Sequence, residues 1–175
     1  PLAIQYPRQS LDDIGADFLS RIGVQAIRMG ISYYPTTHRD YIMEMEKLDR
    51  QLREYKDKNI TVLLMFMEGP ALIPLGNPRS FLDEKGVFLK TKQDYVWLPQ
   101  LDSDFQQFVK NICVKHGWPK GCVTGVHLWN EPWEGISISG WQADMLRYRE
   151  IYTSMANGVL EARKLGADVL IGGTD

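Results

Sequence analysis

The sequence has few of the residues that mark specialised classes of protein. Only two cysteines and three histidines occur among its 175 residues. The histidines are too scattered for a metal-ligand spacing, and the glycine-rich motifs that cradle phosphate groups are absent, so we expect neither a metal nor a cofactor. Cys113 and Cys122 lie nine positions apart and either form one small-loop disulfide or remain two free thiols.

Long apolar runs and an excess of one charge are also missing. The longest purely apolar run, residues 62–67, is far too short to cross a membrane. Lys and Arg number 20 and Asp and Glu number 22, so the formal net charge of −2 gives no sign of a nucleic-acid partner. Hydrophobic residues make up 44% of the chain and aromatic residues 11%, which excludes long disorder and indicates a globular domain.

Apolar residues alternate between helical spacing and short continuous runs. Helices are predicted near residues 10–22, 40–58, 104–115 and 141–165, and strands near 24–31, 60–67, 123–129 and 169–172. The run 60–67 is apolar at nearly every position, as in a strand buried on both faces of a parallel sheet. This alternation predicts right-handed βαβ units, built either as an open doubly wound sheet or as a (β/α)8 barrel.

The residues with the clearest chemical meaning lie where the third predicted strand ends, within 127–133. Glu131 would project into the mouth of a barrel, beside the amide of Asn130. Trp129 and Trp133 offer apolar faces on which a sugar ring can stack. Hydrolysis of a glycosidic bond with retention uses one carboxylic acid to protonate the leaving oxygen and a second carboxylate about 5 Å away. These residues therefore suit the acid half of such a site.

The segment 125–132, Gly-Val-His-Leu-Trp-Asn-Glu-Pro, resembles the strand-4 motif of the clan A retaining (β/α)8 glycoside hydrolases, which include cellulase-, mannanase- and β-xylosidase-like families. The resemblance implies an α/β TIM barrel of which this chain covers roughly strands 2 to 5. It implies that Glu131 is the general acid/base and that Asn130 binds the sugar 2-hydroxyl and the nucleophile. Residues 27–30 resemble the end of strand 2, which implies a place for Arg28 beside the nucleophile; the alternative is an internal salt bridge.

His127 and Glu68 are two further candidates for the site, and each also has a structural explanation. His127 lies either in the layer of the active site or in a structural hydrogen bond of the barrel wall. Glu68 ends the second predicted strand and either faces the cleft or caps the loop that follows. That loop is long and irregular, and it leaves the carboxyl end of a strand, where parallel α/β folds place their ligand sites.

The resemblance also implies that the chain is incomplete. The nucleophilic Glu of the clan lies at the end of strand 7, beyond Asp175, so residues 1–175 are expected to be a partial catalytic domain that lacks its C-terminal part. The remainder of the barrel would come from that missing part or from a second chain, and the family implies a secreted or otherwise extracytoplasmic location. A carbohydrate is the expected substrate.

Two other functions stand beside the glycosidase hypothesis. A barrel that binds glycans without cleaving them would keep the aromatic residues and lack a competent pair of carboxylates. An open-sheet domain that binds a nucleotide or phosphate would use residues 172–174 as its turn, although the sequence has no helix N-terminus after them.

Overall fold

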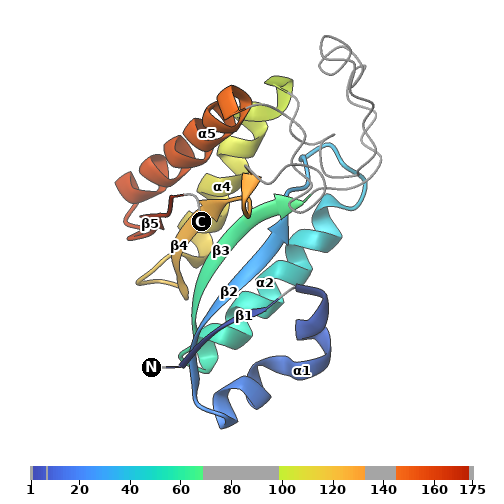
Figure 1. Ribbon diagram of the computed structural model, residues 1–175, viewed down its shortest axis with the longest axis vertical. Helices are drawn as coiled ribbons and strands as arrows, with labels where there is room; N and C mark the ends of the chain where they lie inside the picture. The colour runs from blue at the N-terminus through green and yellow to red at the C-terminus, as the bar shows by residue number, and fades with distance from the viewer. Residues whose placement is uncertain (1, 7, 69–98, 133–144, 174–175) are drawn as a thin grey trace.

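The computed structural model describes residues 2–6, 8–68, 99–132 and 145–173, and only the backbone of residues 2, 4–6, 8–14, 67 and 68. Five strands form one parallel sheet: β1 (Leu2–Tyr6), β2 (Val24–Ser32), β3 (Thr61–Glu68), β4 (Val123–Leu128) and β5 (Leu170–Ile171). The helical elements are α1 (Arg8–Arg21), α2 (Tyr41–Asp57), the short 3₁₀ helix η3 (Pro99–Leu101), α4 (Asp102–His116) and α5 (Met145–Lys164) (Figure 1).

The four strands and four helices expected from the sequence are confirmed, with small shifts at their ends. β1 is not predicted from the sequence, because this strand has only five residues and the polar Gln5 interrupts its apolar pattern. The described residues therefore form five strands where four were expected, and the four predicted strands are β2 to β5. The fourth predicted strand is shorter than expected, since β5 spans only Leu170–Ile171.

The strand order separates the two architectures that the sequence left open. A doubly wound sheet reverses its strand order at a switch point. Here each strand pairs with the one before it, in the order β1-β2-β3-β4-β5, and all four pairings are parallel. Right-handed crossovers that always step in one direction place their helices on one face of the sheet, and α2 and α4 lie behind it in Figure 1. This arrangement is part of the wall of a (β/α)8 barrel, and the doubly wound alternative is wrong.

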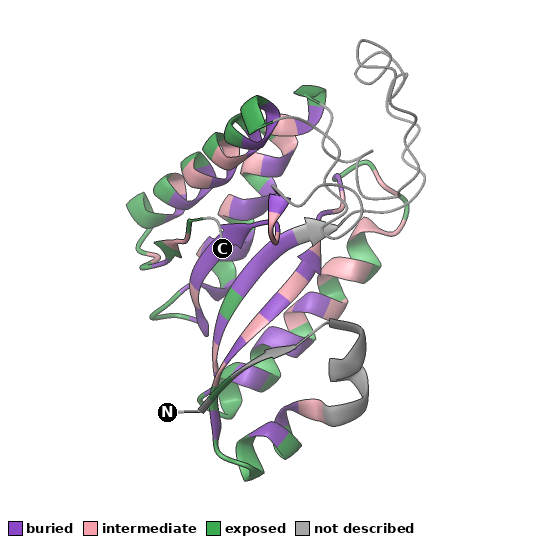
Figure 2. Ribbon diagram, viewed as in Figure 1, coloured by how far each residue is buried: buried purple, intermediate pink, exposed green. Residues whose placement is uncertain are grey.

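Buried and less buried residues alternate along β2 (Figure 2). On β2, the side chains of Ile27, Met29 and Ile31 pack into the core and are at most 2% exposed, whereas Arg28 between them is partly exposed. On β3, Leu63 is 36% exposed although its neighbours in the strand are buried. On the face turned away from the helices, Leu63 is exposed but Met65 is only 6% exposed, so the strand expected to be buried on both faces is fully buried on its helix side and only partly covered on the other.

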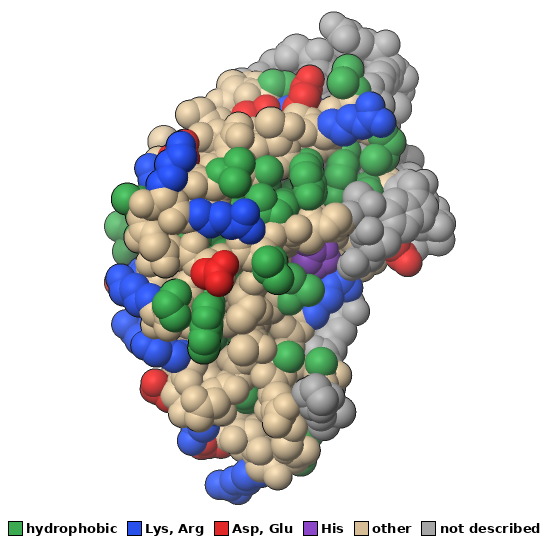
Figure 3. All heavy atoms as spheres, turned by 90° about the vertical axis from the view of Figure 1, so that its left-hand side faces the viewer, with side chains coloured by type: hydrophobic (Ala, Val, Ile, Leu, Met, Phe, Trp, Pro, Cys, Tyr) green, Lys and Arg blue, Asp and Glu red, His purple; other side chains and the backbone are tan. Residues whose placement is uncertain are grey.

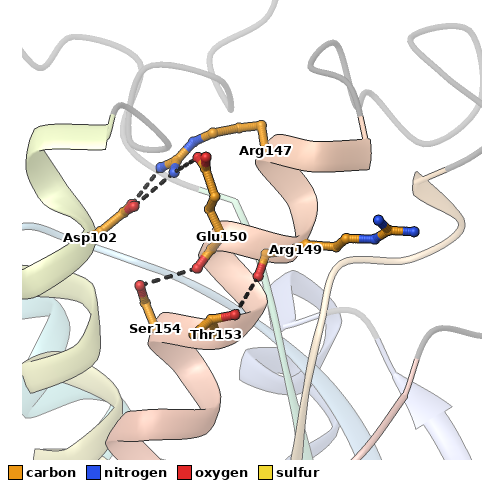
Figure 4. Close-up of polar contacts among 6 residues, drawn as sticks. All are labelled: Asp102, Arg147, Arg149, Glu150, Thr153 and Ser154. Carbon is orange, nitrogen blue, oxygen red and sulfur yellow. Dashed lines mark hydrogen bonds and ion pairs between the residues drawn. The ribbon is translucent and has the colours of Figure 1, made fainter.

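Helices α4 and α5 pack closely against each other and are joined by an ion pair at their first turns. Gly158 allows the close approach, because a Cβ atom there would lie 2.5 Å from the backbone oxygen of Gln106. The guanidinium of Arg147 contacts both carboxylate oxygens of Asp102 and also donates to Glu150 over 2.9 Å (Figure 4). The contacts to Asp102 connect the starts of the two helices that follow β3 and β4.

Several large apolar side chains of α5 and β5 are exposed. Figure 3 shows hydrophobic side chains gathered on the side of the molecule that carries these two elements. The exposed large hydrophobic residues of α5 and β5 are Met145, Leu146, Leu160 and Leu170. No helix in the described ranges is long and apolar enough to span a bilayer.

The two cysteines are free thiols, as in the second of the two expectations for them. Both side chains are buried in the core. Burial raises the pKa of Cys113 to about 12 and that of Cys122 to about 11. Neither thiol is therefore ionised to any useful extent at neutral pH, which gives them a packing role.

Candidate functional site

The candidate site lies at the carboxyl ends of β2, β3 and β4, on the face of the sheet turned away from the helices. The register pairs Gly30 of β2 with Met65 of β3, and Met65 with His127 of β4. Paired residues of a parallel sheet point to the same face, so these three positions form one layer across the strands. Arg28 precedes Gly30 by two residues and therefore points to the same face from one step lower on β2.

Arg28 links this layer to the end of β4. Its Nε–H donates to Nε2 of His127 over 2.9 Å, and its Nη2 donates to Oδ1 of Asn130 over 3.0 Å. The same Nη2 lies 3.2 Å from the sulfur of Met65, so the side chain crosses β3 to reach β4. Arginine can only donate hydrogen bonds, which means that Nε2 of His127 carries a lone pair and that the neutral ring holds its proton on Nδ1.

The contact with Arg28 also fixes which way the amide of Asn130 faces. Because Oδ1 accepts from Arg28, the amide nitrogen points to Glu131, where Nδ2 donates to Oε2 of the carboxylate over 3.1 Å. Arg28, Asn130 and Glu131 thus form a chain of hydrogen bonds in which every donor and acceptor is determined. Both Asn130 and Glu131 are partly exposed, so the carboxylate can reach a bound molecule.

The backbone that carries these side chains has an unusual conformation. Trp129 and Glu131 have positive φ angles of 59° and 49°. For residues other than glycine, this region costs about 1 to 2 kcal/mol each, and such positions cluster at functional sites. The positive φ of Trp129 ends β4 at Leu128, one residue earlier than the sequence pattern predicted. Asn130 and Glu131 therefore leave the plane of the sheet at its carboxyl edge.

A carboxylate of α4 holds the segment after β2 at the same edge of the sheet. Oδ2 of Asp104 accepts a hydrogen bond of 2.6 Å from the hydroxyl of Tyr33, and Oδ1 accepts one of 2.6 Å from Thr36. Burial and the neighbouring carboxylate of Asp104 raise the pKa of Tyr33. Tyr33 therefore remains a neutral donor, and the connection between β2 and α2 is fastened to the start of α4.

The structure brings together four of the seven site residues predicted from the sequence: Arg28, His127, Asn130 and Glu131. Arg28 donates hydrogen bonds to His127 and Asn130. Glu68 ends β3 between the other two strands, but its side chain lies outside the described part of the structure, as does the whole of Trp133.

Trp129 does not offer the exposed face for a sugar ring that was expected from the sequence. Its indole is completely buried in the hydrophobic core. The positive φ turns the side chain into the core, so it has no free face on which a sugar could stack. Trp129 therefore has a packing role in the core.

Two close contacts of Arg28 and His127 were not predicted from the sequence. Met65 lies between Arg28 and the end of β4, and only the register of the sheet identifies it. Gly172 allows β5 to approach closely, because a Cβ atom there would lie 3.0 Å from Cβ of His127. Among the described residues, no group of three His, Cys, Asp or Glu side chains comes together as a metal site.

Comparisons with known proteins yield similarity in structure only. Neither the models of known protein families nor the curated protein sequences match this chain. Among solved structures, virulence factor SghA, bound to its substrate analogue salicin, superimposes with a TM-score of 0.56 at 17% identity, over 94% of this chain and 35% of that one. SghA from Agrobacterium tumefaciens gives 0.55 at 17% identity over the same shares. A family 1 β-glucosidase from Thermotoga maritima gives 0.54 at 18% identity, over 94% of this chain and 36% of that one.

The chain has the fold of part of a glycoside hydrolase barrel. A structure described only as a glycoside hydrolase gives the same result, with a TM-score of 0.51 at 18% identity. This chain spans 35 to 45% of the length of these similar structures, which is consistent with a partial (β/α)8 barrel. At sequence identities this low, the structural similarity establishes the fold alone. The chemistry has to be argued from the residues of the site.

Proposed function

We propose that this chain is part of a retaining glycoside hydrolase in which Glu131 is the general acid/base. The observation that carries the proposal is the chain of hydrogen bonds from Arg28 through Asn130 to Glu131. It lies at the carboxyl ends of parallel strands, which is the edge where enzymes with (β/α)8 barrels bind their substrates. The similarity of fold to glycoside hydrolases supports the same reaction class.

The direction of the hydrogen bonds indicates how the carboxyl group would work. Oε2 of Glu131 accepts from Asn130, so the proton of the acid form is held on Oε1 and is free to pass to a glycosidic oxygen. In the first step, a nucleophilic carboxylate from outside this chain attacks the anomeric carbon while Glu131 protonates the leaving oxygen. In the second step, Glu131 removes a proton from the water that releases the sugar.

The remaining residues bind and orient the substrate in this proposal. Asn130 lies beside the carboxylate, where its amide can reach a sugar hydroxyl, and Arg28 keeps that amide in one orientation. The substrate is a poly- or oligosaccharide, and the remainder of the barrel comes from further residues or from a second chain. We also propose a location outside the cytoplasm, on the strength of the family resemblance; fractionation of the source cells would test it.

The substitution Glu131→Gln in the intact protein tests the proposal. It removes the acid but keeps the size of the side chain, so turnover of a natural oligosaccharide should decrease by about 10²- to 10⁴-fold. An aryl glycoside with a good leaving group needs little help from an acid, so the first step with this substrate should be affected much less. Unchanged turnover of the natural substrate would refute the assignment.

A matched control is Glu46→Gln, which changes an exposed carboxylate on α2. It should leave turnover unchanged on both substrates. If both the parent and Glu131→Gln bind oligosaccharides and neither cleaves them, the protein is instead the non-catalytic glycan-binding barrel. Calorimetric titration with oligosaccharides, run alongside the turnover assay, separates these two outcomes.

A further inference from the structure

Two tyrosines of α5 hold the ends of two neighbouring strands. The hydroxyl of Tyr148 donates to the backbone oxygen of Leu128 over 2.8 Å, and that of Tyr152 donates to the backbone oxygen of Gly172 over 2.9 Å. The two residues are one helical turn apart, and their rings stack with centroids 6.3 Å apart. Leu128 is the last residue of β4, and Gly172 follows the last residue of β5.

The bond from Tyr148 acts on a peptide group that is also held from its other side. The same peptide supplies the oxygen of Leu128 and the nitrogen of Trp129, and this nitrogen donates to the backbone oxygen of Phe66 over 2.8 Å. One peptide plane is thus held by α5 through its oxygen and by β3 through its nitrogen. Tyr148 is only 3% exposed, so water does not readily replace its hydroxyl there.

This peptide plane immediately precedes the strained segment that carries the candidate acid. Trp129 and Glu131 both have positive φ angles, and such conformations persist only where the surroundings hold them in place. Once the plane before Trp129 is fixed, its φ angle decides the direction in which Asn130 and Glu131 leave the strand. The bond from Tyr148 therefore bears on the orientation of the carboxylate without touching it.

We propose that Tyr148 is a positioning residue for Glu131, acting through the carbonyl of Leu128. The part of this inference that concerns catalysis rests on the proposed glycosidase function, whereas the restraint on the backbone does not. Tyr152 is a matched control, because it makes the same kind of bond from the same helix to a strand end that carries none of the hydrogen-bonded site residues.

The restraint is tested by hydrogen exchange in the intact protein, with Tyr148→Phe and Tyr152→Phe compared with the parent. A buried hydrogen bond contributes on the order of 1 kcal/mol, so Tyr148→Phe should speed exchange of the amides of residues 129–131 about five- to tenfold. Tyr152→Phe should speed exchange at residues 172–173 and change residues 129–131 by less than about twofold. Equal effects of the two variants on residues 129–131, or no effect of Tyr148→Phe there, would overturn the proposal.

The catalytic consequence is tested on the same variants with a natural oligosaccharide. Tyr148→Phe should lower kcat about tenfold with little change in KM. It should also displace the alkaline limb of the pH profile of kcat, which reports the proton on the acid in the bound complex. Tyr152→Phe should change neither. Equal losses of kcat in both variants would mean that Tyr148 has only a structural role.

The two experiments fail separately. If the intact protein hydrolyses no glycoside, the proposed function is wrong, yet the contrast in exchange still decides whether Tyr148 holds the segment. If Glu131→Gln abolishes turnover but Tyr148→Phe leaves kcat and exchange unchanged, the function stands and the positioning role is wrong.

Discussion

The guanidinium of Arg147 and the carboxylate of Asp102 form a two-point ion pair between the first turns of α5 and α4 (Figure 4). The side chain of Arg147 is only 3% exposed, whereas that of Asp102 is 29% exposed. A bidentate pair of this kind is both strong and specific in direction. It fixes the distance between the starts of the two helices that follow β3 and β4. The candidate site lies at the carboxyl ends of the same strands.

Removing Asp102 is expected to destabilise the protein markedly. Asp102→Asn leaves the buried guanidinium without its main partner, which should lower the free energy of unfolding by about 3 kcal/mol. Glu150→Gln is the control, because Glu150 pairs with the same guanidinium from a side chain that is 50% exposed. Its loss should cost less than about 1 kcal/mol. Urea denaturation measures the free energy of unfolding of both variants. Equal losses would show that the more buried partner of Arg147 contributes no more than the exposed one.

Gly158 tests how closely α4 and α5 must approach. In an open helical position, Gly→Ala stabilises a protein by up to about 1 kcal/mol. At Gly158 the added Cβ would lie 2.5 Å from the oxygen of Gln106, so the helices would have to move apart. We expect Gly158→Ala to lower the free energy of unfolding by about 1 to 3 kcal/mol, as measured by urea denaturation.

The matched control for this substitution is Gly173→Ala. A Cβ atom at Gly173 meets nothing within 4 Å, and its φ is not in the left-handed region. Its effect on the free energy of unfolding should stay within about 0.5 kcal/mol. A stabilising effect of Gly158→Ala would show that the two helices are not in close contact.

Much of the fold could be predicted from the sequence because local patterns and packing agree. The apolar run of β3 and the helical spacing of α2 and α4 each reflect the face that the element buries in the core. β1 escaped prediction because five residues with one polar member are too few to define a period. The exposure of Leu63 was also missed, since the pattern of a strand does not reveal what covers its second face.

The site was predictable in its residue types and not in its contacts. Asn130 and Glu131 could be identified from their position after an apolar strand. That Arg28 would donate to His127, 99 positions later in the chain, depends on the register of three strands, which no local pattern encodes. The burial of Trp129 likewise depends on a positive φ that the sequence gives no reason to expect in a non-glycine residue.

The protonation of His127 follows from its contact with Arg28. Because Nε of Arg28 donates to Nε2 of His127, the ring should be neutral with its proton on Nδ1 near neutral pH. Nitrogen NMR of the labelled protein should therefore show Nε2 as the nitrogen without a proton. Arg28→Met removes the donor and should shift the Nε2 resonance, while His38, whose Nδ1 accepts from the backbone of Asp40, serves as an internal reference. A protonated Nε2 in the parent would exclude the observed direction of the bond.

A second polar cluster makes the stability of the fold depend on pH. Asp49 of α2 accepts from Lys115 and from His116 at the end of α4, with Oδ1 of Asp49 2.5 Å from Nε2 of His116. Burial alone would raise the pKa of Asp49, but the hydrogen bonds from Lys115 and His116 hold it below its ordinary value. Burial lowers the pKa of His116, against the opposing effect of the hydrogen bond to Asp49.

Both shifts predict that acid destabilises the protein, in two separate steps. The unfolded chain binds a proton at His116 more readily than the folded chain, so the free energy of unfolding should begin to fall below about pH 6.5. Asp49 contributes stability above about pH 4 that is lost as the pH falls through its lowered folded pKa. Urea denaturation at a series of pH values measures this profile. His116→Gln keeps a donor for Asp49 but cannot titrate, so it should weaken the first step and retain the second; an unchanged first step would assign it to another group.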